Sequence, residues 1–151
     1  EEEDLDSWLL YLNGKFALGA ADIKGSIHYG QNLGNFGLWN REAAAYAQVD
    51  ASGEFEDSDS YGGYVQVALP VDPATITLGV GYTTSENDLL ADGEEDDQMS
   101  YFINAKVPLA DKFWVIPEFS YYDHGDDPVG SMDKADGPEA WFAGALLRMD
   151  F

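Results

Sequence analysis

The chain is dominated by segments in which apolar and polar residues alternate with a period of two. This alternation is typical of a β-strand whose two faces meet different environments. Residues 74–84 are a clear case, with Ile76, Leu78, Val80 and Tyr82 on one face and mainly Thr and Gly on the other. The same pattern predicts seven strands, at residues 8–19, 21–30, 60–71, 74–84, 99–109, 113–123 and 141–151.

The predicted strands are unusually long for a soluble sheet. They run to roughly 10–13 residues each, against a usual 5–6. A tilted strand that crosses a membrane needs about 9–11 residues. The sequence therefore predicts an all-β fold of antiparallel transmembrane strands, with residues 1–151 forming part of a single barrel domain.

The connectors between these segments alternate between short and long. Tight turns are predicted at 19–21, 71–74 and 109–112, and long polar loops at 31–59, 85–98 and 124–138. Bacterial outer-membrane barrels have short periplasmic turns and longer extracellular loops. The alternation is therefore typical of that class.

The charge is concentrated in the long connectors. Of the 29 acidic residues, 24 lie in residues 1–7, 31–60, 85–98 and 123–139, together with only Arg41 and Lys134 of the seven basic residues. This edge therefore carries the whole net charge of −22. Such a charge argues against nucleic-acid binding and should attract cations, which predicts a mild cation preference.

Composition excludes several other classes. The chain has no Cys, so disulfide scaffolds, thiol catalysis and Cys-ligated metal centres are excluded. No apolar run approaches the roughly 18–20 residues of a transmembrane helix. The first residues, Glu1 to Asp4, do not resemble a signal peptide, so we expect either that a signal was removed or that the chain starts inside a longer protein.

Aromatic residues fall near the ends of the predicted strands, on the apolar face. Those near the long loops are Trp8, Tyr29, Tyr82, Tyr101, Tyr121 and Trp141, and those near the tight turns are Phe16, Phe113 and Phe151. Two aromatic girdles around an aliphatic band suit a bilayer-facing surface.

Strand direction predicts a larger barrel. If the tight turns are periplasmic, the first and last of seven strands both run inward, whereas a complete bacterial barrel has an even number of strands. We therefore expect the C-terminal part of a larger barrel, of the 16-stranded porin size. Residues 41–48 have helix-forming composition and are assigned to a short loop helix; if 42–51 are instead a strand, the count becomes eight and a small complete barrel is the alternative.

At this point the chain resembles the C-terminal portion of porin-like outer-membrane proteins of Gram-negative bacteria. The resemblance rests on Phe151 at the end of an alternating strand, the run Tyr-Gly-Gln-Asn-Leu-Gly-Asn-Phe-Gly-Leu at 29–38, and Gly-Tyr-Thr-type strands. It implies a passive channel in the outer membrane, often a homotrimer, in contact with the bilayer and lipopolysaccharide. It also implies that the barrel-assembly machinery reads the strand ending at Phe151.

The polar strand faces supply the candidate site. In a wide barrel they would face water, where charged residues set ion selectivity. A basic wall opposed by acids from an inward-folded loop would create a transverse field. The candidate lumen-facing residues are Lys15, Lys24, Gln66, Asn104, Lys106, Glu118, Arg148 and Asp150.

No catalytic, metal or cofactor site is expected. His28 near Asp22 and His124 beside Asp123 have no obvious nucleophile partner. The acidic clusters at 54–59, 94–97 and 123–127 lack EF-hand spacing and are interpreted as solvated loops.

Three functions remain open at this stage. The leading hypothesis is a general-diffusion porin for small hydrophilic solutes and ions. The second is a small eight-stranded barrel that acts as an adhesin or structural anchor and has a packed interior. The third is a soluble all-β binding domain.

Overall fold

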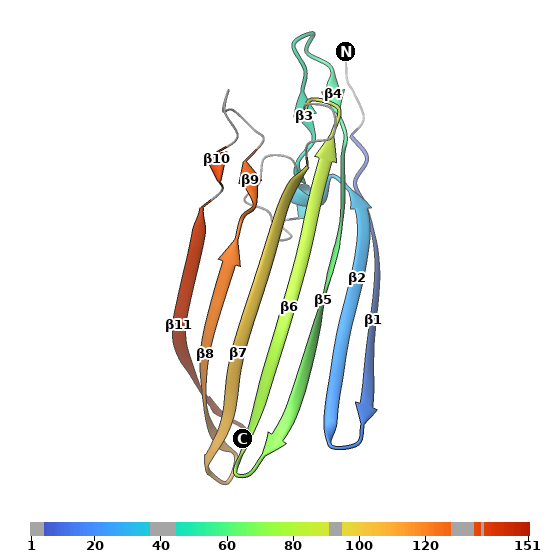
Figure 1. The fold of residues 1–151 in the computed structure, drawn as a ribbon. Helices are drawn as coiled ribbons and strands as arrows, with labels where there is room; N and C mark the ends of the chain where they lie inside the picture. The colour runs from blue at the N-terminus through green and yellow to red at the C-terminus, as the bar shows by residue number, and fades with distance from the viewer. Residues whose placement is uncertain (1–4, 37–44, 91–94, 128–134, 137) are drawn as a thin grey trace.

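A computed structural model describes residues 5–36, 45–90, 95–127, 135–136 and 138–151 of the chain. Seven long strands form one sheet in the order in which they occur in the sequence, and every neighbouring pair is antiparallel (Figure 1). The strands are β1 (Trp8–Leu18), β2 (Ala21–Gln31), β5 (Ser58–Val71), β6 (Ala74–Asn87), β7 (Asp96–Ala110), β8 (Phe113–Asp123) and β11 (Glu139–Met149). The seven predicted strands and the all-β antiparallel class are confirmed.

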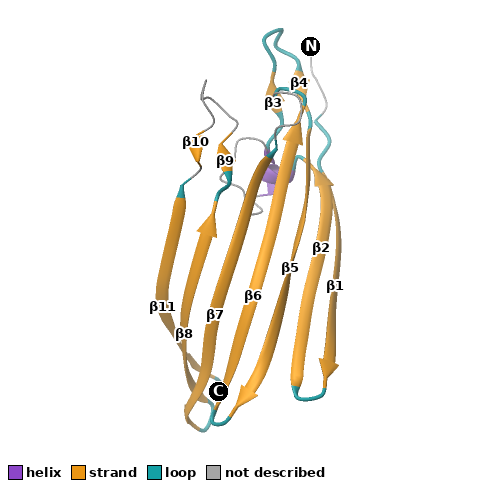
Figure 2. Ribbon diagram, in the orientation of Figure 1, coloured by secondary structure: helices purple, strands orange, loops and turns teal. Residues whose placement is uncertain are grey.

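The remaining elements are short and lie at one end of the sheet (Figure 2). They are the 3₁₀ turn η1 (Leu33–Phe36), the strand pair β3 (Gln48–Val49) and β4 (Phe55–Glu56), and the pair β9 (Asp126–Asp127) and β10 (Ala135–Asp136). The predicted loop helix at 41–48 falls partly outside the described residues. Within the described part of 42–51, strand is confined to β3, which pairs with β4 and does not join the large sheet.

The connectors sort by length to opposite ends of the sheet, as predicted. The hairpins β1–β2, β5–β6 and β7–β8 turn through two residues each at one end, which also holds the C-terminus (Figure 1). Gly19 and Lys112 adopt left-handed backbone angles in two of these turns, with φ of 62° and 57°. We call this the tight-turn end, and the opposite one the long-loop end.

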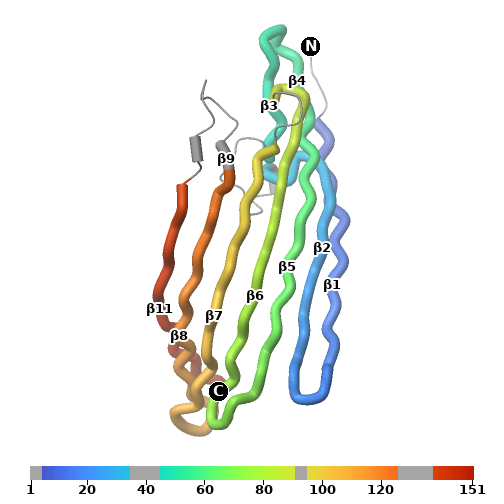
Figure 3. The backbone as a smooth tube through the Cα atoms, in the orientation of Figure 1, coloured from blue at the N-terminus to red at the C-terminus, as the bar shows by residue number. Residues whose placement is uncertain are grey.

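The sheet is not closed. Among the described residues β1 pairs only with β2 and β11 only with β8, so each leaves one edge unpaired. Both edge strands run from the long-loop end to the tight-turn end, as the trace in Figure 3 shows, so they are parallel to each other.

Cross-strand register joins the apolar positions into one continuous face, which we call the apolar face. One row crosses five strands through Val65, Val80, Tyr101, Tyr121 and Trp141, each directly opposite the next. The aromatic side chains in this row are in contact, with ring centroids 6.3 Å apart for Tyr101–Tyr121 and 4.3 Å for Tyr121–Trp141. The other face, which carries the alternate residues, is called the polar face.

Burial is inverted relative to a water-soluble domain. Among the described residues Leu33 and Ala45 are the only buried apolar side chains, and the largest fully buried ones are all Asn, Ser and Thr. In contrast, Leu10, Phe16 and Trp141 on the apolar face are 64–71% exposed. No helix within the described residues is long and apolar enough to cross a membrane.

Candidate functional site

The eight candidate residues all lie on the polar face, although they do not converge at one point. Lys15, Lys24 and Gln66 occupy one row across β1, β2 and β5. Asn104 and Glu118 face each other across β7 and β8. The other three, Lys106, Arg148 and Asp150, lie toward the tight-turn end.

Most of these side chains have a partner on the same face. Lys15 forms an ion pair with Asp22, with 3.0 Å between Nζ and Oδ2, and Arg148 forms one with Asp150, with 3.0 Å between Nε and Oδ1. The ammonium of Lys106 lies 4.3 Å from the ring centroid of Trp114, a cation–π arrangement.

Glu118 is the acceptor of a small hydrogen-bond network. Asn104 donates from Nδ2 to its Oε2 over 3.2 Å, and Ser120 donates from Oγ to its Oε1 over 3.1 Å. Both carboxylate oxygens are therefore held in place by neutral donors on β7 and β8.

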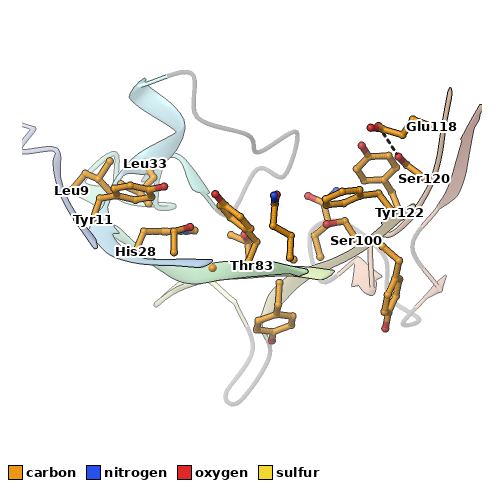
Figure 4. A pocket seen from close by; sticks show the side chains of 18 residues that line it. Leu9, Tyr11, His28, Leu33, Thr83, Ser100, Glu118, Ser120 and Tyr122 are labelled. Carbon is orange, nitrogen blue, oxygen red and sulfur yellow. Dashed lines mark hydrogen bonds between the residues drawn. The ribbon is translucent and has the colours of Figure 1, made fainter. Parts of the chain in front are cut away.

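A hollow of about 460 Å³ lies on the polar face, between the charged rows and the long-loop end. Figure 4 shows the sheet as an arc, with the labelled side chains on its concave side and Leu33 of η1 above it. Most of the lining is aromatic or uncharged polar: Tyr11, Ser26, His28, Tyr64, Gln66, Thr83, Gln98, Ser100, Phe102, Ser120 and Tyr122, with Glu118 at one side.

Sequence reasoning missed the aromatic part of this site. Tyr64 and Tyr122 occupy the same row of the polar face, separated by Gly81 and Ser100. The ring of Phe102 covers Gly79, where a Cβ would come within 2.2 Å of it. An available signal was the presence of large aromatic residues at the polar positions of four different strands: Tyr11, Tyr64, Phe102 and Tyr122.

Asn32 ties the long-loop end of the sheet together. It is fully buried, has a left-handed φ of 53°, and follows β2 directly. Its backbone N–H donates to the Ser58 carbonyl over 2.8 Å, and its Oδ1 accepts from the Ser58 N–H over 3.0 Å. Its Nδ2 donates to the Asp6 carbonyl over 2.8 Å and to Asp57 Oδ1 over 2.7 Å.

This clamp directs the chain after β2 over the polar face. Leu33 is buried against Gly30, and the Tyr46 ring lies over Gly34, where a Cβ would come within 2.7 Å. Ser58 Oγ donates to the Tyr46 carbonyl over 2.7 Å. Leu33 therefore lines the hollow on the polar face, and the Tyr46 ring packs on the residue that follows it.

Two acids of this loop, Asp50 and Glu54, lie away from the basic residues of the polar face. Asp50 and Glu54 belong to the β3–β4 hairpin, which extends beyond the sheet in Figure 1. In its turn Asp50 accepts from the Ser52 hydroxyl over 2.7 Å and from the Ser52 and Glu54 N–H groups over 2.8 Å each. The Ser52 bond, followed by that from Glu54, holds the pKa of Asp50 below its ordinary value.

The candidate acid–base pair on β2 is separated in the structure. Asp22 and His28 lie six residues apart along one strand, which corresponds to about 20 Å, and Asp22 is paired with Lys15. The second candidate, Asp123 with His124, lies at and just after the end of β8. Across the described residues no three His, Asp or Glu side chains are grouped so that they could hold a metal ion.

Comparisons with protein-family models, with curated proteins and with solved structures find no match to this chain. The site is therefore interpreted from its own geometry.

Proposed function

We propose that this sheet is part of the wall of a porin-type β-barrel in the outer membrane of a Gram-negative bacterium. The barrel passes small hydrophilic solutes and ions through a water-filled lumen lined by the polar face. The observation that carries the proposal is the inverted burial: the apolar face has large exposed side chains on each of seven strands of 11–15 residues, while the largest fully buried side chains are Asn, Ser and Thr. A bilayer is the environment in which such a face gains free energy.

The two unpaired edges support a larger barrel. In hydrocarbon, each unpaired backbone N–H or C=O costs several kcal/mol, so spanning sheets are closed. Because β1 and β11 run in the same direction, they cannot close on each other with the antiparallel pairing used throughout the sheet. An odd number of further strands would complete a ring of alternating direction, as in a 16-stranded porin.

The alternatives are less well supported by the same features. A packed eight-stranded barrel needs one more strand than the sheet has, and β3 does not supply it. A soluble binding domain would leave the apolar face, including Leu12 and Leu147 at 65% exposure each, in water.

Two neighbouring residues on β7 test the membrane orientation. Ile103 lies on the apolar face between Leu78 and Phe119, and Asn104 lies on the polar face between Thr77 and Glu118. Ile103→Arg should destabilise the folded protein by about 2–4 kcal/mol, as expected for a cation near the bilayer midplane. Asn104→Arg should cost little, because its charge meets water and Glu118.

The measurement is the equilibrium between folded and unfolded intact protein in lipid vesicles, followed by urea titration. Equal costs for the two substitutions, or an intact protein that is monomeric in water without detergent, would overturn the proposal.

Ion selectivity provides a second test. The long-loop end carries the net charge and should concentrate cations at that mouth. We therefore expect the reversal potential of the intact protein in a planar bilayer, measured across a KCl gradient, to show mild preference for K⁺. Preference for Cl⁻ would contradict the assignment of the acidic loops to the channel mouth.

Assembly follows the same proposal. The strand ending at Phe151 would engage the barrel-assembly machinery, and the barrel would assemble as a homotrimer in contact with lipopolysaccharide.

A further inference from the structure

The hollow on the polar face has a floor of small residues between aromatic walls. Gly81 lies in the row between Tyr64 on one side and Ser100 on the other, with Tyr122 one strand further on. Tyr64 and Tyr122 are three strand positions apart, or about 14 Å along the sheet. Because Gly81 has no side chain, the Ser100 hydroxyl occupies the space beside it, and these two small residues let a ligand come close to the sheet.

The polar groups of this hollow are almost all uncharged. Hydroxyls and amides come from Ser26, Gln66, Gln98 and Ser100. Among the described residues of the lining, Glu118 is the one carboxylate, and its oxygens accept hydrogen bonds from Asn104 and Ser120. These residues include no Lys or Arg, so the lining offers an anion no fixed positive charge, and most of its polar groups suit a neutral ligand.

The size and chemistry of the hollow together define a class of ligand. A volume of about 460 Å³ is within the usual 300–1,000 Å³ of small-molecule sites, which combine aromatic walls with a few placed polar groups. Aromatic faces suit a ring with an apolar C–H surface, and neutral donors and acceptors suit hydroxyl groups around its edge. A pyranose ring has both features, whereas a lipid chain lacks the hydroxyls.

We propose that this hollow is a binding subsite for neutral saccharides on their way through the channel. Tyr64 and Tyr122 lie at opposite sides of the hollow, and each offers a ring that can contact the apolar face of a sugar, while the amide and hydroxyl groups of Gln66, Gln98 and Ser100 bind its hydroxyls. This proposal rests on the proposed channel function and names its preferred class of solute.

The test uses the intact protein in a planar bilayer and two neutral probes. Methyl α-D-glucopyranoside has a pyranose ring, and sorbitol is an open-chain hexitol with hydroxyls but no ring. The glucoside should reduce the ion current in a saturable manner, and sorbitol at the same concentration should reduce it only through viscosity. Equal reduction by the two probes, while the channel conducts normally, would overturn the saccharide subsite and leave the porin function standing.

Variants locate the effect. The double variant with Tyr64→Leu and Tyr122→Leu should raise the glucoside concentration that blocks half of the current by about tenfold or more. Gly81→Val should have a similar effect by filling the floor, with Ser100 as the nearest side chain to move, since a Cβ at Gly81 would come within 2.8 Å of its Oγ. The control is Phe142→Leu, which removes an aromatic ring from the same face outside the hollow and should leave the blocking concentration unchanged.

A binding measurement separates the two proposals if no current is seen. Saturation-transfer NMR on the detergent-solubilised intact protein should detect the glucoside, with loss of the signal in the double Tyr variant. Transfer without conductance would retain the subsite and overturn the channel. If neither conductance nor transfer is observed, both are overturned.

Discussion

The two ends of the sheet are built in different ways. At the long-loop end, Asn32, Ser58, Ser60 and Ser85 are fully buried and hydrogen-bonded, and the Ser60 and Ser85 hydroxyls lie 2.7 Å apart. At the tight-turn end the hairpins are exposed, and strand pairing and the two-residue turns hold them. Buried polar groups are costly unless they are hydrogen-bonded. The conformation of the long-loop end therefore depends on a few specific hydrogen bonds, whereas the tight-turn end is held by the strand pairing as a whole.

The largest effect should come from Asn32 at the long-loop end. Asn32→Ala would leave the Ser58 N–H without its side-chain acceptor and would replace Asn, which tolerates a left-handed φ, by a residue that tolerates it less well. We expect the free energy of unfolding to fall by about 2–3 kcal/mol. Urea unfolding of the intact protein in detergent would measure the change.

The control for this prediction is Asn13→Ala. Asn13 is exposed on the polar face of β1, and its loss should change the free energy of unfolding by no more than about 0.5 kcal/mol. Equal effects of the two substitutions would remove the contrast between a clamped end and an unclamped one.

A smaller effect is expected at the tight-turn end from Lys15→Met. The Lys15–Asp22 pair is about half exposed, at 55% and 45% of the two side chains, so screening by water limits its strength. We expect a loss of about 0–1 kcal/mol in the free energy of unfolding, decreasing as salt is added. A loss as large as that of Asn32→Ala, or one insensitive to salt, would show that this end also contains a specific clamp.

The smallest effect concerns pH and the β3–β4 hairpin. Because the folded pKa of Asp50 is lowered, its stabilising contribution is fully present above the ordinary Asp pKa of 3.8 and is lost as pH falls from there through the lowered folded value. As the pH falls through that range, the protection of the Ser52 and Glu54 amides against hydrogen exchange should decrease, with no corresponding change at the tight-turn end. In Asp50→Asn the protection of these amides, corrected for their intrinsic exchange rates, should not change with pH in this range. If the protection still falls with pH in this variant, another group is responsible for the change.

The strands could be predicted from the sequence because the alternation of apolar and polar residues follows directly from the different environments of the two faces of the sheet. The alternation stops where both faces of a strand are polar. In the structure β6 nevertheless continues through 85–87 and β7 already begins at Asp96, so both strands run past the predicted ends. Backbone pairing continues there although the apolar pattern has stopped. The same parity placed the candidate residues, such as Lys24 and Glu118, on one face.

Other features depend on contacts that a linear pattern does not contain. Asn32 bonds with Ser58, 26 residues away, and nothing in the residues around it indicates that partner. The walls of the hollow, Tyr64 and Tyr122, become a pair only when the register of three intervening strand pairings is known. On the polar face the sequence pattern assigns a role to charged and amide residues, and none to the aromatic ones.

The sorting of charge to one end would make the two ends of the sheet behave differently during the proposed insertion into a membrane. The long-loop connectors and N-terminal residues carry the whole −22, whereas the rest of the chain is neutral. Moving a single ionised side chain through hydrocarbon already costs several kcal/mol. In the proposed topology the turns at Gly19, Pro73 and Lys112 stay on the periplasmic side, so the acidic loops would have to cross the bilayer from there. The charge pattern would in this way make unassisted insertion costly and make the protein dependent on the barrel-assembly machinery.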